Sequence, residues 1–311
     1  MQGIWIYSED STIAKQLLTA GLNLKEAMNQ PLGVITLDAG QAKSLIDSGA
    51  DKVVVLKGEN NWPESYAEAI GKFAVQEETG VLLVGGTLRG KDLAAKVAVS
   101  LDAALVTDAQ SIKAANGSLE TTRLMYGGLA VCTEQVSLPA VLTVPPSNFE
   151  EAKPVEGRKG ETSTIDVSEF DQRISVNEVC PIVRQGVDIT TAGKIVCVGR
   201  GISQKEDLKI AEELAQAMGA EIACTRGIAE DYHWLPEERY IGISGQKVKP
   251  EVYISIGVSG QVQHVAGIRD SKIIVAIDSN EKAPIFEAAD YGIVGDLYEV
   301  VPMLTAALGK K

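Results

Sequence analysis

Short apolar runs alternate with amphipathic stretches over the first hundred residues of the chain. The runs at 3–8, 32–37, 52–56 and 80–84 are almost continuously apolar, as strands buried on both faces of a parallel sheet are. Between them, apolar residues recur at helical spacing. The pattern predicts a parallel sheet covered by helices. We expect these helices over residues 11–29 (capped by Ser11), about 64–77, 41–47 and 91–101.

The pattern changes after Leu105. Shorter strands are predicted at 112–114, 119–124, 130–136 and 140–144, and together they form a β-rich tail. Residues 147–164 are polar and show no apolar period, so we interpret them as surface or linker. The first domain, an α/β scaffold, is therefore placed at residues 1–165, and residues 166–189 form a connecting segment.

A second αβ pattern fills residues 190–311. It predicts a Rossmann-like domain, so that the fold class is α/β with two domains. Gly219 is well placed to end the first helix of this domain. The expected strands are 194–198, 221–225, 252–256, 272–277 and 291–294, and the expected helices are 205–218 and 297–308.

Composition and charge narrow the functional classes. A length of 311 residues suggests two domains, and the net charge of −13 disfavours binding to nucleic acid or to anionic membranes. It does not exclude an anionic ligand, because backbone N–H groups can bind phosphate locally. The start of the chain does not resemble a signal peptide and no run predicts membrane insertion, so we expect a cytoplasmic protein. Two histidines and four scattered cysteines predict no metal site, and Cys197 and Cys224 read as buried thiols.

The most informative segments lie in the second domain. Residues 193–204 combine a strand, a Gly-Arg-Gly turn at 199–201 and the start of a helix, an arrangement that lets backbone N–H groups approach a pyrophosphate. The third glycine of the dinucleotide fingerprint is missing, since Gln204 stands there. Taken alone, this turn fits an ordinary strand–helix connection equally well.

Three later segments favour a ligand site. Thr225 and Arg226 end the next strand, where open α/β sheets bind their ligands. Ser244 lies in a short loop between glycines. The Gly-Val-Ser-Gly-Gln-Val-Gln-His run at 257–264 has a composition that can nest an anion.

With these segments in order, the chain resembles the alpha subunit of electron transfer flavoprotein. The resemblance covers nearly the whole chain and is strongest over residues 199–308. It also includes the segments 90–101, 123–133, 270–277 and 283–297. It implies one FAD held mainly by the second domain, a beta subunit as partner, and a redox carrier rather than a substrate-converting enzyme. Electrons would come from a partner dehydrogenase and leave to a second redox partner, while the first domain would dock the beta subunit.

The resemblance also implies the cofactor-binding residues. Arg226 matches an arginine that lies against the flavin ring and favours its reduced, anionic form. Ser244 matches a hydroxyl that bonds the central redox nitrogen. His264 matches a histidine near the pyrimidine carbonyl, where a donor would stabilise negative charge on reduction. Residues 259–263 would hold the ribityl and phosphate region, and Asp278 and Asp296 would lie toward the adenosine. The implied set is Arg200, Thr225, Arg226, Ile241, Gly242, Ile243, Ser244, Ser259, Gly260, Gln261, Val262, Gln263, His264, Asp278, Asp296 and Leu297.

Two positions depart from the family pattern. Ile243 stands where a glutamine is common, so it can contribute only its backbone, and Asp278 stands where many members have asparagine.

The sequence leaves two other hypotheses about the function open. One is an NAD- or nucleotide-binding oxidoreductase module that uses the Gly-Arg-Gly turn. The other is a structural subunit that has lost its flavin, against which Arg226, Ser244 and His264 argue.

Overall fold

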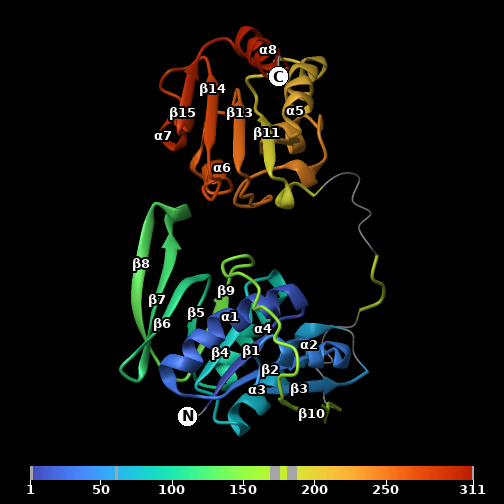
Figure 1. The fold of residues 1–311 in the computed structure, drawn as a ribbon, viewed down its shortest axis with the longest axis vertical. Coiled ribbons are helices and arrows are strands. Elements are labelled where there is room, and N and C mark those ends of the chain that lie inside the picture. Colours follow the sequence, from blue (N-terminus) through green and yellow to red (C-terminus); the bar gives the residue numbers. More distant parts are fainter. Residues whose placement is uncertain (1–2, 60–61, 169–175, 181–187, 310–311) are drawn as a thin grey trace. The chain divides into compact units, whose positions relative to one another are not determined.

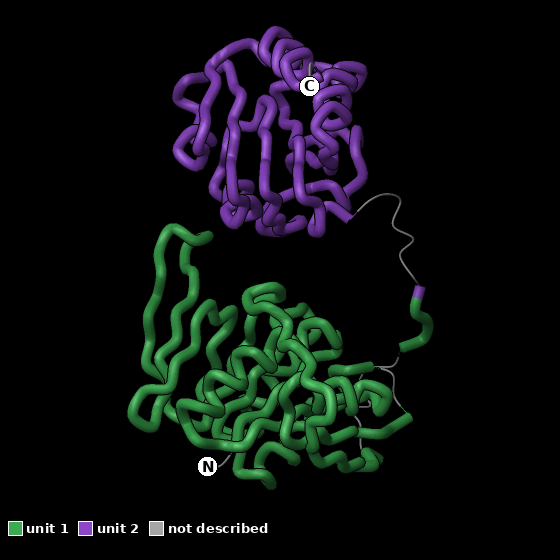
Figure 2. The backbone as a smooth tube through the Cα atoms, viewed as in Figure 1, with its two compact units in different colours: residues 1–179 green, residues 180–311 purple. Residues whose placement is uncertain are grey.

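The computed structural model of the chain describes residues 3–59, 62–168, 176–180 and 188–309. The chain divides into two compact units, residues 1–179 and 180–311 (Figure 2). Each unit is built around its own parallel sheet, which confirms the predicted fold class. Among the described residues, no helix is long and apolar enough to cross a membrane.

Unit 1 contains a seven-stranded parallel sheet in the order β10-β3-β2-β1-β4-β9-β5 (Figure 1). The central strand, β1 (Ile4–Tyr7), is buried on both faces, which explains why apolar and polar residues do not alternate along it. Ile4 and Ile6 pack with α1 on one face, and Trp5 and Tyr7 pack with α3 and α4 on the other. The other strands are β2 (Leu32–Thr36), β3 (Lys52–Lys57), β4 (Val81–Gly85), β5 (Ala104–Val106), β9 (Ala140–Val144) and β10 (Glu161–Asp166), and the helices are α1 (Ser11–Met28), α2 (Ala42–Asp47), α3 (Ala67–Gln76) and α4 (Leu88–Ser100).

A separate three-stranded antiparallel sheet follows β5, with β6 (Ala109–Ala115), β7 (Ser118–Met125) and β8 (Ala130–Ser137). The hairpin of β7 and β8 extends away from the body of unit 1 (Figure 1). Its tip exposes Tyr126 and Leu129. The β-rich texture predicted after Leu105 is thus present.

Three expectations for unit 1 are corrected, and one strand was not expected. Residues 161–166, partly assigned to the linker, form edge strand β10, which pairs with β3. All six of its residues are exposed, so the sequence carries no apolar period there. β9 belongs to the central parallel sheet rather than to the tail, and β5 was not predicted. The cap of α1 is Asp10 rather than Ser11, because the Asp10 carboxylate accepts from the N–H groups of Thr12 and Ile13.

Unit 2 is a five-stranded parallel sheet in the order β12-β11-β13-β14-β15. Val196 and Val198 of β11 pack toward α5 and α8, whereas Ile195 and Cys197 face the opposite side of the sheet. The predicted burial of Cys197 and Cys224 is confirmed. Short helices α6 and α7 were not predicted. The elements are β11 (Lys194–Val198), α5 (Leu208–Met218), β12 (Glu221–Cys224), β13 (Val252–Ile256), α6 (Val262–Val265), β14 (Ile274–Asp278), α7 (Ile285–Ala288), β15 (Tyr291–Val294) and α8 (Leu297–Leu308).

Candidate functional site

A cavity of about 610 Å³ lies at the carboxyl ends of the unit 2 strands. The strand order reverses between β11 and β13, and loops that follow these two strands line the cavity. Such a reversal is where open α/β sheets bind ligands. Twelve of the sixteen residues implied by the resemblance line it: Arg200, Thr225, Arg226, Ile241, Gly242, Ser244, Ser259, Gly260, Gln261, Gln263, His264 and Asp278.

The Gly-Arg-Gly turn needs a glycine at both positions because the turn after β13 packs closely against it. A Cβ on Gly199 would lie 2.2 Å from the carbonyl oxygen of Gly257, and one on Gly201 would lie 2.6 Å from the Gly257 Cα. The Gly201 N–H donates to the same carbonyl over 3.0 Å. The two turns therefore pack backbone against backbone. Arg200, between the glycines, lays its side chain over Gly227 and reaches the cavity.

The loop after β13 offers unpaired backbone donors. Within the part of the chain that the structure describes, the buried Val258 and Gly260 make no hydrogen bond. Gly260 has φ +80° and lies so close to Ile285 that a Cβ would come within 2.2 Å of its nitrogen. Buried N–H groups without a protein partner usually meet water or a ligand. This observation fits a phosphate-bearing cofactor such as FAD.

Arg226 provides positive charge at the same edge. It follows β12 and directly precedes a single π-helical turn, Gly227–Asp231. Its side chain is 66% exposed, and its Nε donates to Glu230 over 2.6 Å. The hydrogen bond and charge of Glu230 raise the pKa of Arg226. The arginine thus reaches the cavity with a carboxylate partner already in place, a contact that no motif in the sequence predicts.

The loop over 241–246 brings Ser244 to the cavity and turns Ile243 away from it. Ile243 is half exposed, and its backbone N–H donates to the Gln263 carbonyl over 2.9 Å. Ile243 is not among the residues that line the cavity, whereas Ser244 is. The Ser244 hydroxyl lies 2.7 Å from the Tyr240 hydroxyl. The loop and α6 are therefore tied together by the backbone of Ile243.

His264 is buried at the cavity wall with both ring nitrogens engaged. Nδ1 lies 3.1 Å from the Ile241 carbonyl, which can only accept, so Nδ1 carries the proton of the neutral ring. Nε2 then accepts from the Tyr253 hydroxyl over 2.7 Å. Burial lowers the pKa of His264 to about 4, against a partly compensating bond to Ile241. This differs from the donor role that the resemblance implies, because Tyr253 occupies the second nitrogen.

The remaining predicted residues have other surroundings. The Asp278 carboxylate lines the cavity and accepts from the Asn280 N–H over 2.8 Å. Asp296 caps α8 by accepting from the Tyr298 N–H, and Leu297 belongs to the core beneath it. Val262 lies partly exposed on α6. Asp296, Leu297, Val262 and Ile243 are therefore the predicted residues that do not line this cavity.

Several lining residues were missed by the sequence reading. Gly201, Gly257 and Val258 lie in the Gly-Arg-Gly turn and in the 257–264 run, beside residues that the resemblance implies for the site. Tyr240 directly precedes the selected loop, and Asp231 carries no signal in the sequence. The missed residues are Gly201, Gly227, Asp231, Tyr240, Gly257 and Val258.

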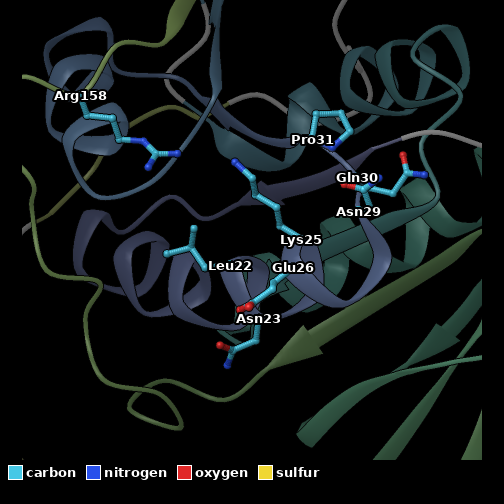
Figure 3. Close-up of a pocket in the computed structure, with 8 residues that line it drawn as sticks. All are labelled: Leu22, Asn23, Lys25, Glu26, Asn29, Gln30, Pro31 and Arg158. Carbon is cyan, nitrogen blue, oxygen red and sulfur yellow. The ribbon is translucent and has the colours of Figure 1, made fainter.

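A second cavity, of about 670 Å³, lies in unit 1 near the end of α1 (Figure 3). Its cations are already paired. Lys25 Nζ lies 2.6 Å from Asp51 Oδ1, and Arg158 contacts the same carboxylate over 3.1 Å and the Gly49 carbonyl over 2.8 Å. Burial alone would raise the pKa of Asp51, but these partners and the Leu32 N–H lower it. This cluster therefore links α1 and the segment before β10 to the residue that precedes β3.

Comparison with known proteins agrees with the geometry. Residues 188–269 match the family model of the electron transfer flavoprotein FAD-binding domain, and residues 5–170 match that of the electron transfer flavoprotein domain. Protein FixB of Escherichia coli O6:K15:H31 (strain 536 / UPEC) is 38% identical over 313 residues, spanning 99% of this chain and 98% of the relative. Protein FixB of Shigella dysenteriae serotype 1 (strain Sd197) is 37% identical with the same coverage.

Fold, site and matches together define an FAD-binding protein of electron transport. More particularly, the chain belongs to the electron transfer flavoprotein family, as an alpha subunit similar to FixB. Its cofactor is FAD.

Proposed function

We propose that this chain is the FAD-carrying subunit of a two-subunit electron carrier, which accepts electrons from a dehydrogenase and passes them to a second redox partner. The observation that carries the proposal is the cavity between β11 and β13, which gathers two arginines, hydroxyl groups and unpaired backbone donors. Bound FAD supplies the chemistry, because it takes up and releases electrons. The protein binds it, orients it and sets the charge around it.

Different groups of the site would contact different parts of FAD. The N–H groups of Val258 and Gly260 would hold the pyrophosphate without adding charge. The net charge of the chain is −13, which repels an anionic cofactor. Arg226 and Arg200 would provide positive charge at the site itself. The Ser244 hydroxyl would donate to the flavin, and the neutral ring of His264 would form part of the wall.

The partners follow from the family. Electron transfer flavoprotein alpha subunits pair with a beta subunit, and we propose that unit 1 docks it. The hairpin of β7 and β8 supports this role, because Tyr126 is 76% exposed and Leu129 70% exposed at its tip. Exposed apolar groups gathered at one place commonly mark interaction surfaces. The alternative of an NAD-binding module is less well supported, since the glycines of the Gly-Arg-Gly turn are accounted for by packing against Gly257 and residues 188–269 match an FAD-binding family model.

The test is the absorbance spectrum of the complex purified with its beta subunit. The proposal expects flavin bands in the visible and about one FAD per alpha chain, whereas a colourless complex that takes up no FAD would refute it. Arg226→Ala is expected to lower the midpoint potential of bound FAD or to weaken its binding by roughly tenfold. Unchanged potential and occupancy would remove Arg226 from the site.

A further inference from the structure

We propose that Tyr240 is a positioning residue of the FAD site, whose hydroxyl donates to Ser244 Oγ and so turns the Ser244 proton toward the cofactor. This inference rests on the proposed function. The two oxygens lie 2.7 Å apart, and both residues line the cavity. Tyr240 is only 6% exposed, so most of this residue is buried beside the cavity.

The loop around Tyr240 holds its ring in one place. A Cβ on Gly242 would lie 3.0 Å from Cε2 of the ring, and one on Gly245 would lie 2.8 Å from Cδ1. The two glycines thus let the loop close over the ring. Gln246 N–H donates to the Tyr240 carbonyl over 2.8 Å, which fixes the backbone of the same turn. The surrounding loop therefore restricts the Tyr240 ring and keeps its hydroxyl next to Ser244.

The count of protons gives the bond a direction. Each hydroxyl has one proton to donate, and within the described residues Ser244 Oγ has Tyr240 as its hydrogen-bond partner. If Ser244 donated to Tyr240, it would have no proton left for a ligand acceptor. The phenol is the more acidic hydroxyl, so it is the better donor of the pair. With Tyr240 donating, Ser244 keeps its proton for the cofactor, and the two bonds in series strengthen each other.

A double-mutant cycle on the complex with the beta subunit separates this role from general packing. FAD dissociation constants and midpoint potentials are measured for wild type, Tyr240→Phe, Ser244→Ala and the double variant. Tyr240→Phe keeps the ring and removes the donor, so we expect FAD binding to weaken by roughly three- to tenfold and the potential to change. In the Ser244→Ala background the same substitution should have no further effect. In the Ser244→Thr background, which keeps a hydroxyl, the effect should return.

The matched control is Tyr291→Phe on β15, an exposed tyrosine outside the cavity, which should leave both measurements unchanged. An effect of Tyr240→Phe that persists in the Ser244→Ala background would overturn the positioning role while leaving the proposed function intact. So would a Tyr240→Phe complex that matches wild type. A wild-type complex that takes up no FAD would overturn both. Denaturant unfolding of each variant shows whether the fold is retained.

Discussion

The two sheets of this chain are both parallel and each has a point where the strand order reverses, but the chemistry at that edge differs. In unit 1 the reversal lies between β1 and β4, and in unit 2 between β11 and β13. The unit 1 edge carries two carboxylates, those of Glu9 and Glu64. Thr87 donates to the Glu9 carboxylate, and Glu64 lies buried nearby with Arg89 at 3.8 Å. The unit 2 edge instead has Arg200, Arg226 and unpaired backbone donors.

The pKa of Tyr7 illustrates the contrast. Burial is the main cause that raises it, the charges of Glu9 and Glu64 raise it further, and the charge of Arg89 partly opposes them. The two carboxylates thus disfavour a further negative charge beside Tyr7. An anionic dinucleotide is disfavoured there and favoured at the unit 2 edge. The comparison teaches that topology provides a place for a ligand, while the side chains and free donors at that place decide whether an anion binds.

The largest expected effect comes from adding one methyl group to a glycine that packs against backbone in each unit, Gly199 after β11 and Gly90 in the first turn of α4. Gly199→Ala would place a Cβ against the Gly257 carbonyl, and Gly90→Ala would place one 2.0 Å from the Gly85 carbonyl. Backbone cannot move aside cheaply, so each should lower the free energy of unfolding by about 3 kcal/mol. Only Gly199→Ala should also reduce FAD binding by more than tenfold. Denaturant unfolding and FAD titration check the two effects.

Gly193→Ala is the matched control, because a Cβ there meets no atom within 4 Å. It should change neither unfolding nor FAD binding. If Gly90→Ala reduced FAD affinity as strongly as Gly199→Ala, the contrast between the two edges would be wrong.

The sequence allowed most elements of both sheets to be predicted, because buried parallel strands such as β1 and β11 are apolar on both faces. β10 escaped prediction because its pairing with β3 uses the backbone while all its side chains face solvent. Most of the cavity was predicted through the family segments. The pairing of Arg226 with Glu230 and of His264 with Tyr253 was not, since these contacts depend on how a π-helical turn and a buried strand present their side chains.

A second prediction concerns acid stability, which should depend on unit 2 through His264. Its pKa is about 4 in the folded chain, below the ordinary value of 6.5. As the pH falls below 6.5, His264 becomes protonated in the unfolded chain but stays neutral in the folded chain. The free energy of unfolding therefore decreases down to about pH 4 and is constant below it. The loss from this residue is about 3 kcal/mol.

The measurement is denaturant unfolding from pH 7 to pH 4, with His264→Gln as the comparison. Glutamine can keep a donor toward Ile241 and an acceptor toward Tyr253, but it does not titrate. The variant should lose less stability over this window than wild type does. Equal slopes would mean that the folded histidine takes up its proton as readily as the unfolded one. No comparable histidine lies within the described residues of unit 1.

The smallest expected effect concerns the charge of Arg226 and how strongly it favours FAD binding at the unit 2 edge. Glu230→Gln removes the carboxylate that lies 2.6 Å from Arg226 Nε, so more of the positive charge becomes available to FAD. We expect FAD to bind about two- to fivefold more tightly at low ionic strength, with the gain shrinking as salt is added. The control, Glu213→Gln, breaks another exposed ion pair of the same spacing, with Lys209 on α5. If both variants bound FAD equally tightly, general charge would explain the gain; if only Glu230→Gln did, the arginine acts at the site itself.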